Sequence, residues 1–345
     1  MDLYSYLLPT DRIATHPSEP RDASKLLIYK TQTDELLFDT FANLARYLPS
    51  DSFLVMNETK VLPARVRATR DGETLEMMIL PSEVDYEGGT VIGGGTVKGT
   101  ANKRLRNGQT LQLTPLHTLT VIEETQKAFT FRANFDLHTL PALLLEIGQT
   151  PIPHYIQHAG LSEAELREKY QTIFAKNPGS VAAPTASLHF TDRVFRDLDA
   201  AGIERLFITL HVGLGTFAPV LPEHMESRTL YEEHIDLPPK TVARIHELKA
   251  AGKRCTAVGT TSTRTLESLA RGHSGTTNLF ILPPFDFQLV DQLLTNFHLP
   301  NSSLMMLVEA FLQHKHAKRH LKDLYEIAIQ NDFRFYSFGD SMLIL

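Results

Sequence analysis

The sequence contains a single cysteine, Cys255, and no tryptophan among its 345 residues. One cysteine excludes a disulfide framework within the chain and any CxxC zinc or redox site, and it is consistent with a reducing compartment. No apolar run approaches the roughly 20 residues that a membrane helix needs, and Met1–Tyr6 lacks the basic start of a secretory signal. We therefore expect a cytoplasmic protein, acting as a monomer, that enters no membrane.

Familiar motifs and repeats are also missing. The sequence has no repeat of fixed period and no P-loop, HExxH or GxSxG motif. These absences argue against solenoids and propellers and against the commonest nucleotide, zinc-protease and serine-hydrolase sites. His154 and His158 could pair on a helix, but Pro151 and Pro153 crowd that segment and no third ligand is evident. We expect no bound metal.

The excess of charge of one sign is small, since the sequence has 34 basic and 40 acidic residues and a net charge of −6. This balance argues against indiscriminate coating of nucleic acid but leaves room for local basic faces. Three basic clusters are present, at 65–70, 98–106 and 314–322. Each could hold a phosphate backbone, and each could equally be ordinary solvated surface.

The length allows about two domains of ~150 residues, and the pattern of residues changes twice along the chain. Between Pro63 and Pro151, Gly and Thr are frequent and apolar residues alternate with polar ones, as in the run from Phe129 to Phe135. Such alternation predicts a small antiparallel barrel or sandwich. The flanking segments alternate helix and strand patterns, which is typical of α/β layers. The simplest architecture is a discontinuous α/β domain, 1–62 plus 151–345, with an all-β insertion, 63–150.

Local signals predict individual elements of the α/β part. Ser162 and Glu165 match a capping box, Thr191 is suited to cap a helix, and Pro239 fits a first helical turn. Further helices are expected around 266–269 and over 304–312. Apolar runs predict a hairpin over 28–38 and strands over 53–56, 206–210, 256–258 and 279–282.

The first candidate site is the segment 258–265, which follows an expected strand and opens a helix. Its substrate-binding candidates are Gly259, Thr260, Thr261, Ser262 and Arg264. Free N–H groups at a helix start favour negative charge, and an arginine adds a planar donor fork for carboxylate or phosphate. The alternative is a plain capping loop, because Ser and Thr are common helix caps.

The second candidate is the segment 209–217, in which His211 precedes Gly213 and Gly215. It matches half of a dinucleotide fingerprint, GxGxxA, after a strand. Pro219 interrupts the segment where that fingerprint needs a continuous helix, which argues against a nicotinamide site. Two glycines beside a histidine are typical of a strand end that approaches a ligand closely. The alternative is a tight turn with a structural histidine.

Two further segments bear candidate ligand groups. In 178–191, small residues and prolines allow close packing, and Thr185 and His189 could contact a substrate. In 293–303, Asn296 and His298 alternate with apolar residues, so both could face one side. The alternatives are a rigid loop before the next helix and a loop whose polar side chains satisfy only backbone groups.

Taken together, these motifs in this order resemble the S-adenosylmethionine:tRNA ribosyltransferase-isomerases of queuosine biosynthesis. The similarity spans nearly the whole chain. It is carried by the segments 21–26, 57–61, 170–172, 182–191, 209–217, 258–268, 294–300 and 334–340.

Membership of this family implies a large α/β domain built around a twisted β-barrel, with a smaller β-barrel inserted. It also implies a reaction in which the ribosyl part of S-adenosylmethionine moves to the aminomethyl group of 7-aminomethyl-7-deazaguanine at the tRNA wobble position. The product is epoxyqueuosine-tRNA, and adenine and methionine leave. S-adenosylmethionine is then a consumed co-substrate, with no metal or other cofactor.

Such a reaction needs a base for the carbon beside the sulfonium, assistance to adenine departure, and anchors for the carboxylate and the sugar. His211 is the leading acid/base candidate, because histidine works near neutral pH. The matched motifs supply the substrate-binding candidates Arg21, Asn57, Thr185, His189, Gly213, Gly215, Thr216, Phe217, Gly259, Thr260, Thr261, Ser262, Arg264, Asn296 and His298.

The chain departs from the family in one stretch. Relatives usually carry His-x-Met-His-x-Glu after the TLHVG segment, whereas residues 228–233 here keep only Glu233. Glu233 is therefore a second candidate base. Because the histidines are missing, one alternative is a relative of the family that binds S-adenosylmethionine or RNA without turnover. A second alternative, suggested by Gly213 and Gly215, is a nicotinamide oxidoreductase.

Overall fold

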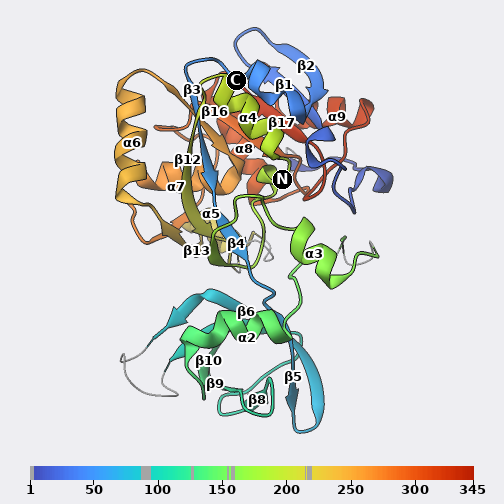
Figure 1. The fold of residues 1–345 in the computed structure, drawn as a ribbon, viewed down its shortest axis with the longest axis vertical. Helices are drawn as coiled ribbons and strands as arrows, with labels where there is room; N and C mark the ends of the chain where they lie inside the picture. Colours follow the sequence, from blue (N-terminus) through green and yellow to red (C-terminus); the bar gives the residue numbers. More distant parts are fainter. Residues whose placement is uncertain are drawn as a thin grey trace.

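The computed structural model describes residues 4–86, 95–125, 128–153, 155–156, 160–213, 215 and 220–345. The described strands form a large mixed sheet, a closed six-stranded barrel and a short two-stranded sheet. In Figure 1 the barrel lies below the large sheet and its helices, with α3 beside the connection between them.

The large sheet is built around β3, all six of whose residues are buried. Parallel β12 and β14 flank β3 on either side. Continuous burial of this kind is expected of a parallel strand covered on both faces. The strands, in spatial order, are β15 (Thr276–Leu279), β13 (Thr229–Asp236), β12 (Glu204–His211), β3 (Ser52–Asn57), β14 (Arg254–Val258), β16 (Gln292–Asn296), β17 (Ser341–Ile344), β1 (Lys25–Lys30) and β2 (Glu35–Thr40).

Helices cover both faces of this sheet, and alternate strand residues face opposite sides. On one face, Leu27 and Val55 pack with α6, α7, α8 and α9. On the other, Leu26 and Leu54 pack with α1 and α4. The helices are α1 (Leu44–Tyr47), α3 (Glu163–Lys169), α4 (Asp192–Ala200), α5 (Pro222–Ser227), α6 (Pro239–Ala250), α7 (Gly259–Leu269), α8 (Ser303–His314) and α9 (Leu321–Gln330).

The barrel closes in the strand order β10-β7-β6-β5-β8-β9, and helix α2 (Leu140–Ile147) packs against it. Its strands are β5 (Arg65–Arg70), β6 (Glu73–Asp85), β7 (Thr96–Ala101), β8 (Thr110–Gln112), β9 (Thr118–Glu124) and β10 (Phe129–Ala133). Inward residues such as Leu111 and Phe131 are fully buried, which follows from the alternation in the sequence. All of these elements fall inside 63–150, whose exact domain boundaries stay a prediction.

The α/β class with an inserted β-barrel is confirmed. The large sheet, however, runs from β15 to β2 as an open ladder of nine strands, where the resemblance implied a twisted barrel. The expected strand over 279–282 lies earlier, at Thr276–Leu279, because Thr277 and Leu279 pair with β13 while Phe280–Leu282 pack into apolar clusters. The hairpin, the other strands, the Ser162 capping box and the Thr191 cap form as expected.

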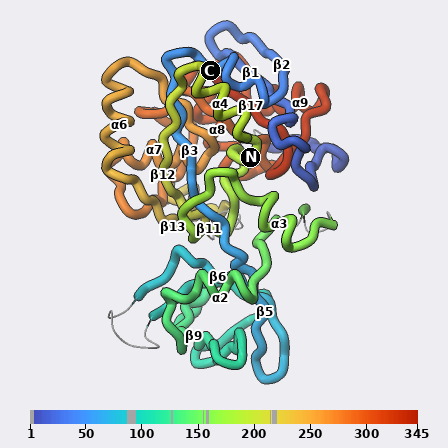
Figure 2. The backbone as a smooth tube through the Cα atoms, viewed as in Figure 1, coloured from blue at the N-terminus to red at the C-terminus, as the bar shows by residue number. Residues whose placement is uncertain are grey.

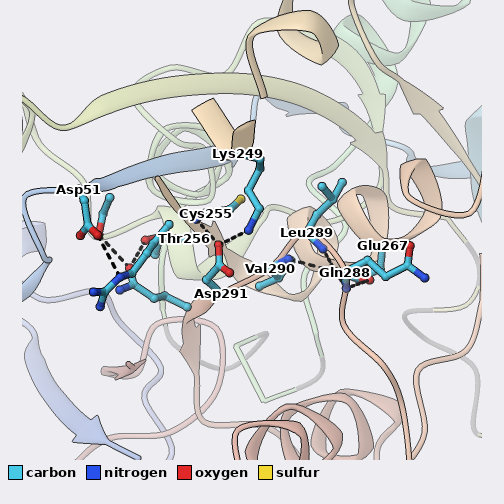
Figure 3. A network of polar contacts seen from close by, with 12 residues as sticks. Asp51, Lys249, Cys255, Thr256, Glu267, Gln288, Leu289, Val290 and Asp291 are labelled. Atoms are coloured by element: carbon cyan, nitrogen blue, oxygen red, sulfur yellow. Dashed lines mark hydrogen bonds and ion pairs between the residues drawn. The ribbon is translucent and has the colours of Figure 1, made fainter. Parts of the chain in front are cut away.

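Two carboxylates, the buried Glu267 and the half-buried Asp291, hold α7 and its neighbours together. Glu267, at the far end of α7, accepts hydrogen bonds from the backbone N–H groups of Gln288, Leu289 and Val290. Asp291 accepts from Lys249 and from the N–H of Cys255, as Figure 3 shows. This network ties α7 to the loop before β16, so the N-terminus of α7 is held at one end of the sheet.

Candidate functional site

The N-terminus of α7 follows β14 directly and carries the first candidate motif. Gly259 has φ +85°, a backbone conformation that favours glycine. No side chain caps this helix, because the N-cap residue is Val258, which has no polar side-chain group. Thr263 and Thr265 use their hydroxyls on backbone carbonyls of their own helix. The hydroxyls of Thr261 and Ser262 are buried and make no hydrogen bond with any described group. The helix therefore presents unused donors at its positive end.

Thr261 lines a cavity of about 430 Å³, whereas the sequence candidate Ser262 is fully buried and does not line it. Eight of the sequence candidates line it together, from four separate segments: Thr185, Glu233, Gly259, Thr260, Thr261, Arg264, Asn296 and His298. The remaining lining is largely apolar and aromatic, including Tyr155, Phe297 and Tyr336. An apolar cavity with a few convergent polar groups is typical of a small-molecule site.

Arg264 and Glu233 form a buried ion pair at the edge of this cavity. Glu233 also accepts a hydrogen bond from the N–H of Gly213 at 3.3 Å, and Arg264 donates through Nε to the carbonyl of Leu279 at 3.2 Å. Arg264 Nη2 remains buried without a partner among the described residues. The guanidinium is thus fixed in direction and still has donors for a carboxylate.

Asn296 is oriented by three neighbours. Its Oδ1 accepts from the hydroxyl of Thr185 at 3.0 Å, and its Nδ2 lies 3.2 Å from both His189 Nε2 and the carbonyl of Asp340. His189 lies behind Asn296, where its Nδ1 is 2.9 Å from the hydroxyl of Ser24. Burial lowers the pKa of His189 to about 3, so its ring is neutral and its Nε2 can accept from the amide.

His298 also lines the cavity, and its backbone holds it firmly. Its N–H donates to the hydroxyl of Tyr325 at 2.9 Å, and its carbonyl accepts from the hydroxyl of Tyr6 at 2.5 Å. Burial lowers the pKa of His298 to about 3, so this side chain is an uncharged hydrogen-bonding group at neutral pH.

His211 lies in a second cavity of about 520 Å³, between the barrel and the large sheet. Gly213 lines the same cavity, and Glu233 is common to both linings. The cavity is rich in carboxylates, which include Glu83, Asp85, Glu123, Glu232 and Glu233. The sequence candidates therefore line two neighbouring cavities that meet at Glu233.

The imidazole of His211 is held on two sides. Thr59 Oγ1 lies 2.8 Å from His211 Nδ1, and the ring packs on Gly179, where an added Cβ would lie 2.9 Å from three ring atoms. Burial, followed by the charge of His234, lowers the pKa of His211 to about 4. The ring is accordingly neutral at pH 7. The sequence predicted a histidine that titrates near neutral pH, and this lowered pKa differs from that expectation.

Other predicted residues lie elsewhere. Arg21 lines a third cavity beside α3. Asn57 is fully buried, and its amide bonds the backbone of Leu210 and Thr59, which leaves it no group for a substrate. Gly215 packs against the ring of Tyr231. Thr216, Phe217 and the pair His154 and His158 lie outside the described residues.

Several lining residues were not expected from the sequence. Tyr170, Tyr336 and Ser337 line the first cavity and come from the matched segments 170–172 and 334–340. Tyr336 has φ +73°, which is rare for a non-glycine residue and often occurs at functional sites. The sequence signal that could have pointed to this residue is the run Ser-Phe-Gly that follows Tyr336. Thr59 and Gly179, which hold His211, carry no signal of that kind.

One protein family matches almost the whole of this chain. The family model described as queuosine biosynthesis protein matches residues 1–344. This chain belongs to that family. The S-adenosylmethionine:tRNA ribosyltransferase-isomerase of Thermosynechococcus vestitus is 41% identical, over 100% of this chain and 96% of its own length. The enzyme of the same name from Carboxydothermus hydrogenoformans is 39% identical, over 99% and 98%.

A solved structure supports the same placement within the queuosine biosynthesis family. The crystal structure of the S-adenosylmethionine tRNA ribosyltransferase from Thermotoga maritima is 29% identical to this chain and superimposes with a TM-score of 0.54, covering 99% of this chain and 100% of that one. No group of three or more potential metal ligands occurs among the described residues. None of the described helices has the length and apolar character needed to cross a membrane.

Proposed function

We propose that this chain transfers the ribosyl moiety of S-adenosylmethionine to 7-aminomethyl-7-deazaguanine at the wobble position of tRNA, forming epoxyqueuosine and releasing adenine and methionine. The observation that carries the proposal is the first cavity, where the family's separate motifs converge. Full-length similarity to curated enzymes of that name supports it. In this proposal the protein acts as a cytoplasmic monomer with S-adenosylmethionine as co-substrate and no other cofactor.

The methionine carboxylate is assigned to the N-terminus of α7. Unpaired donors there include Arg264 Nη2 and the hydroxyl of Thr261. A helix N-terminus and a guanidinium fork both favour a carboxylate, and fixing it orients the sulfonium carbon. Asn296 and His298, both neutral, are assigned to hydroxyl or base groups of the substrates on the opposite lining.

Glu233 is assigned to positioning Arg264, because both of its oxygens already accept hydrogen bonds. His211 remains the leading base. Its neutral ring can take a proton, and Thr59 and Gly179 fix the ring's direction. The carboxylates around His211 complement the cationic aminomethyl group of the acceptor base, which supports approach of the acceptor from the second cavity.

The test is an adenine-release assay with labelled S-adenosylmethionine and tRNA that carries the aminomethyl base. We expect adenine release with label entering the tRNA. His211→Gln should reduce turnover by about 10²- to 10⁴-fold while S-adenosylmethionine still binds. Binding of both substrates to the wild type without adenine release would instead identify a non-catalytic relative, and near-normal turnover of His211→Gln would remove His211 from the base role.

A further inference from the structure

A third cavity, of about 520 Å³, lies beside α3 and is separate from the two described above. We call it the α3 cavity. The residues that matter to its chemistry are Arg21, Lys60, Leu145, Tyr170, Thr172 and Ile173. Tyr170 lines both this cavity and the first one, so the two cavities are neighbours. Figure 2 shows α3 at the junction where the chain passes to the barrel.

Cationic side chains outnumber carboxylates on the lining of the α3 cavity. Arg21 donates to the carbonyls of Gln171 and Glu168, at 2.5 and 2.8 Å, but forms no ion pair with any described residue. Burial lowers the pKa of Arg21, and the charge of Glu168 opposes this shift. Lys60 is exposed and likewise has no ion pair within the described part of the chain. The lining holds three cations, Arg21, Lys60 and Arg167, and one carboxylate, Glu168. Arg167 is paired with Glu163, so the remaining cations still outnumber the carboxylate.

A second observation points to a ligand. The side chain of Thr172 lines the cavity and is only 5% exposed, yet its hydroxyl has no hydrogen-bond partner among the described groups. A buried hydroxyl without a partner is costly, and natural structures seldom keep one. A bound group with acceptor oxygens would satisfy it. Arg21, Lys60 and Thr172 together therefore suit an oxyanion.

The rim of the cavity adds an apolar element. Leu145 is 51% exposed and Ile173 is 46% exposed. Large exposed apolar side chains beside unpaired cations fit a ligand with both anionic and flat apolar parts, which describes a nucleotide chain. The barrel's basic cluster is less suitable, because Lys98 pairs with Glu83 and Lys103 pairs with Glu73.

We propose that the α3 cavity binds a backbone phosphate of the RNA substrate, next to the nucleotide that enters the catalytic cavity. This inference rests on the proposed function, and it extends that function by naming where the RNA backbone is held. Because Tyr170 lines both cavities, a phosphate in the α3 cavity lies beside the first cavity, which is assigned to S-adenosylmethionine. Contacts of this kind set the register of the RNA without selecting its sequence.

Thr172→Val is the sharpest test, because valine keeps the shape of the side chain and removes the unpartnered hydroxyl. Removing a buried hydroxyl that bonds nothing in the free protein should leave thermal stability equal or higher. If the hydroxyl bonds a phosphate, the KM for tRNA should rise by about tenfold, with the KM for S-adenosylmethionine and kcat unchanged. Unchanged KM for tRNA would contradict the proposal.

Lys60→Ala tests the charge. The tRNA affinity, measured by fluorescence anisotropy over a range of salt concentrations, should fall, and the slope of log affinity against log salt should shrink by about 0.7. Lys240→Ala is the matched control, since Lys240 is exposed on α6 and lines none of the three cavities. That variant should titrate like the wild type.

The two proposals fail in distinguishable ways. Failure of the enzymatic function appears in the wild type itself, as an absence of adenine release. Failure of the α3-cavity proposal appears only in the variants, when Lys60→Ala and Thr172→Val bind tRNA with wild-type affinity and salt slope. Inorganic phosphate is the probe for the alternative occupant, a free phosphate ion rather than a phosphate of RNA. Binding of millimolar phosphate at this cavity that leaves tRNA binding unchanged, with wild-type tRNA affinity in both variants, would overturn RNA as the occupant.

Discussion

The carboxylate of Glu233 and the guanidinium of Arg264 form an ion pair in which both side chains are almost fully buried, on the lining of the catalytic cavity. The two residues lie on different elements, β13 and α7, and the pair joins them. Because neither charge has water around it, each depends on the other for its stability.

Removing one partner should therefore be far more damaging than removing both. Arg264→Met leaves the Glu233 carboxylate buried and unpaired, and we expect it to lower the free energy of unfolding by about 3–5 kcal/mol. The double variant Arg264→Met with Glu233→Gln should recover much of that loss. Urea denaturation of the three proteins measures this. A loss below about 1 kcal/mol for the single variant would mean that solvent screens the pair.

The ring of His211 should be displaced by any side chain at position 179. An added Cβ at Gly179 lies 2.9 Å from three atoms of the imidazole, so Gly179→Ala should lower turnover by about 10²-fold through misplacement. S-adenosylmethionine affinity should be unaffected. Gly202→Ala is the control, since Gly202 also has positive φ but open space around it. That variant should lose about 1–2 kcal/mol of stability and keep its turnover.

The hydroxyl of Thr185 should matter through Asn296. Thr185→Val keeps the shape but leaves Asn296 Oδ1 without its 3.0 Å donor, freeing the amide to rotate. We expect the KM of one substrate to rise by about fivefold, the equivalent of one hydrogen bond. Separate titrations of S-adenosylmethionine and tRNA will identify which substrate Asn296 contacts. Unchanged KM values for both would exclude Asn296 from substrate binding.

Stability should fall on acidification below neutral pH. Burial lowers the pKa of His189 and His298 to about 3 and that of His211 to about 4, whereas the unfolded chain titrates near ~6.5. Between these values the unfolded state binds more protons than the folded state. Each histidine therefore contributes stability that is complete above pH ~6.5 and declines by up to ~1.4 kcal/mol per pH unit below it.

Unfolding free energies at pH 7, 6 and 5 measure this decline. His189→Gln should flatten the dependence by about one proton. The control His246→Gln replaces a histidine exposed on α6 and should leave the dependence as it is in the wild type. A wild-type stability that stays level from pH 7 to pH 5 would show that these rings are solvated in the folded state.

Local sequence signals determined much of this protein. The β1–β2 hairpin, the Ser162 capping box and the start of α7 after β14 depend on residues that are neighbours in the chain, so short-range patterns suffice to predict them. The alternation over 63–150 determined the barrel's inward face. The motifs around Thr185, Gly259 and Asn296 also belong to one cavity, as their residue types suggested.

The tertiary structure alone decided which polar groups meet. Asn57 satisfies the backbone of Leu210, 153 positions away, rather than a ligand, and Arg21 faces the α3 cavity rather than the catalytic one. His211 takes its direction from Thr59, 152 positions earlier in the sequence. Such contacts depend on the order and register of strands in the sheet, and local residue patterns carry no information about the long chain closures that bring those strands together.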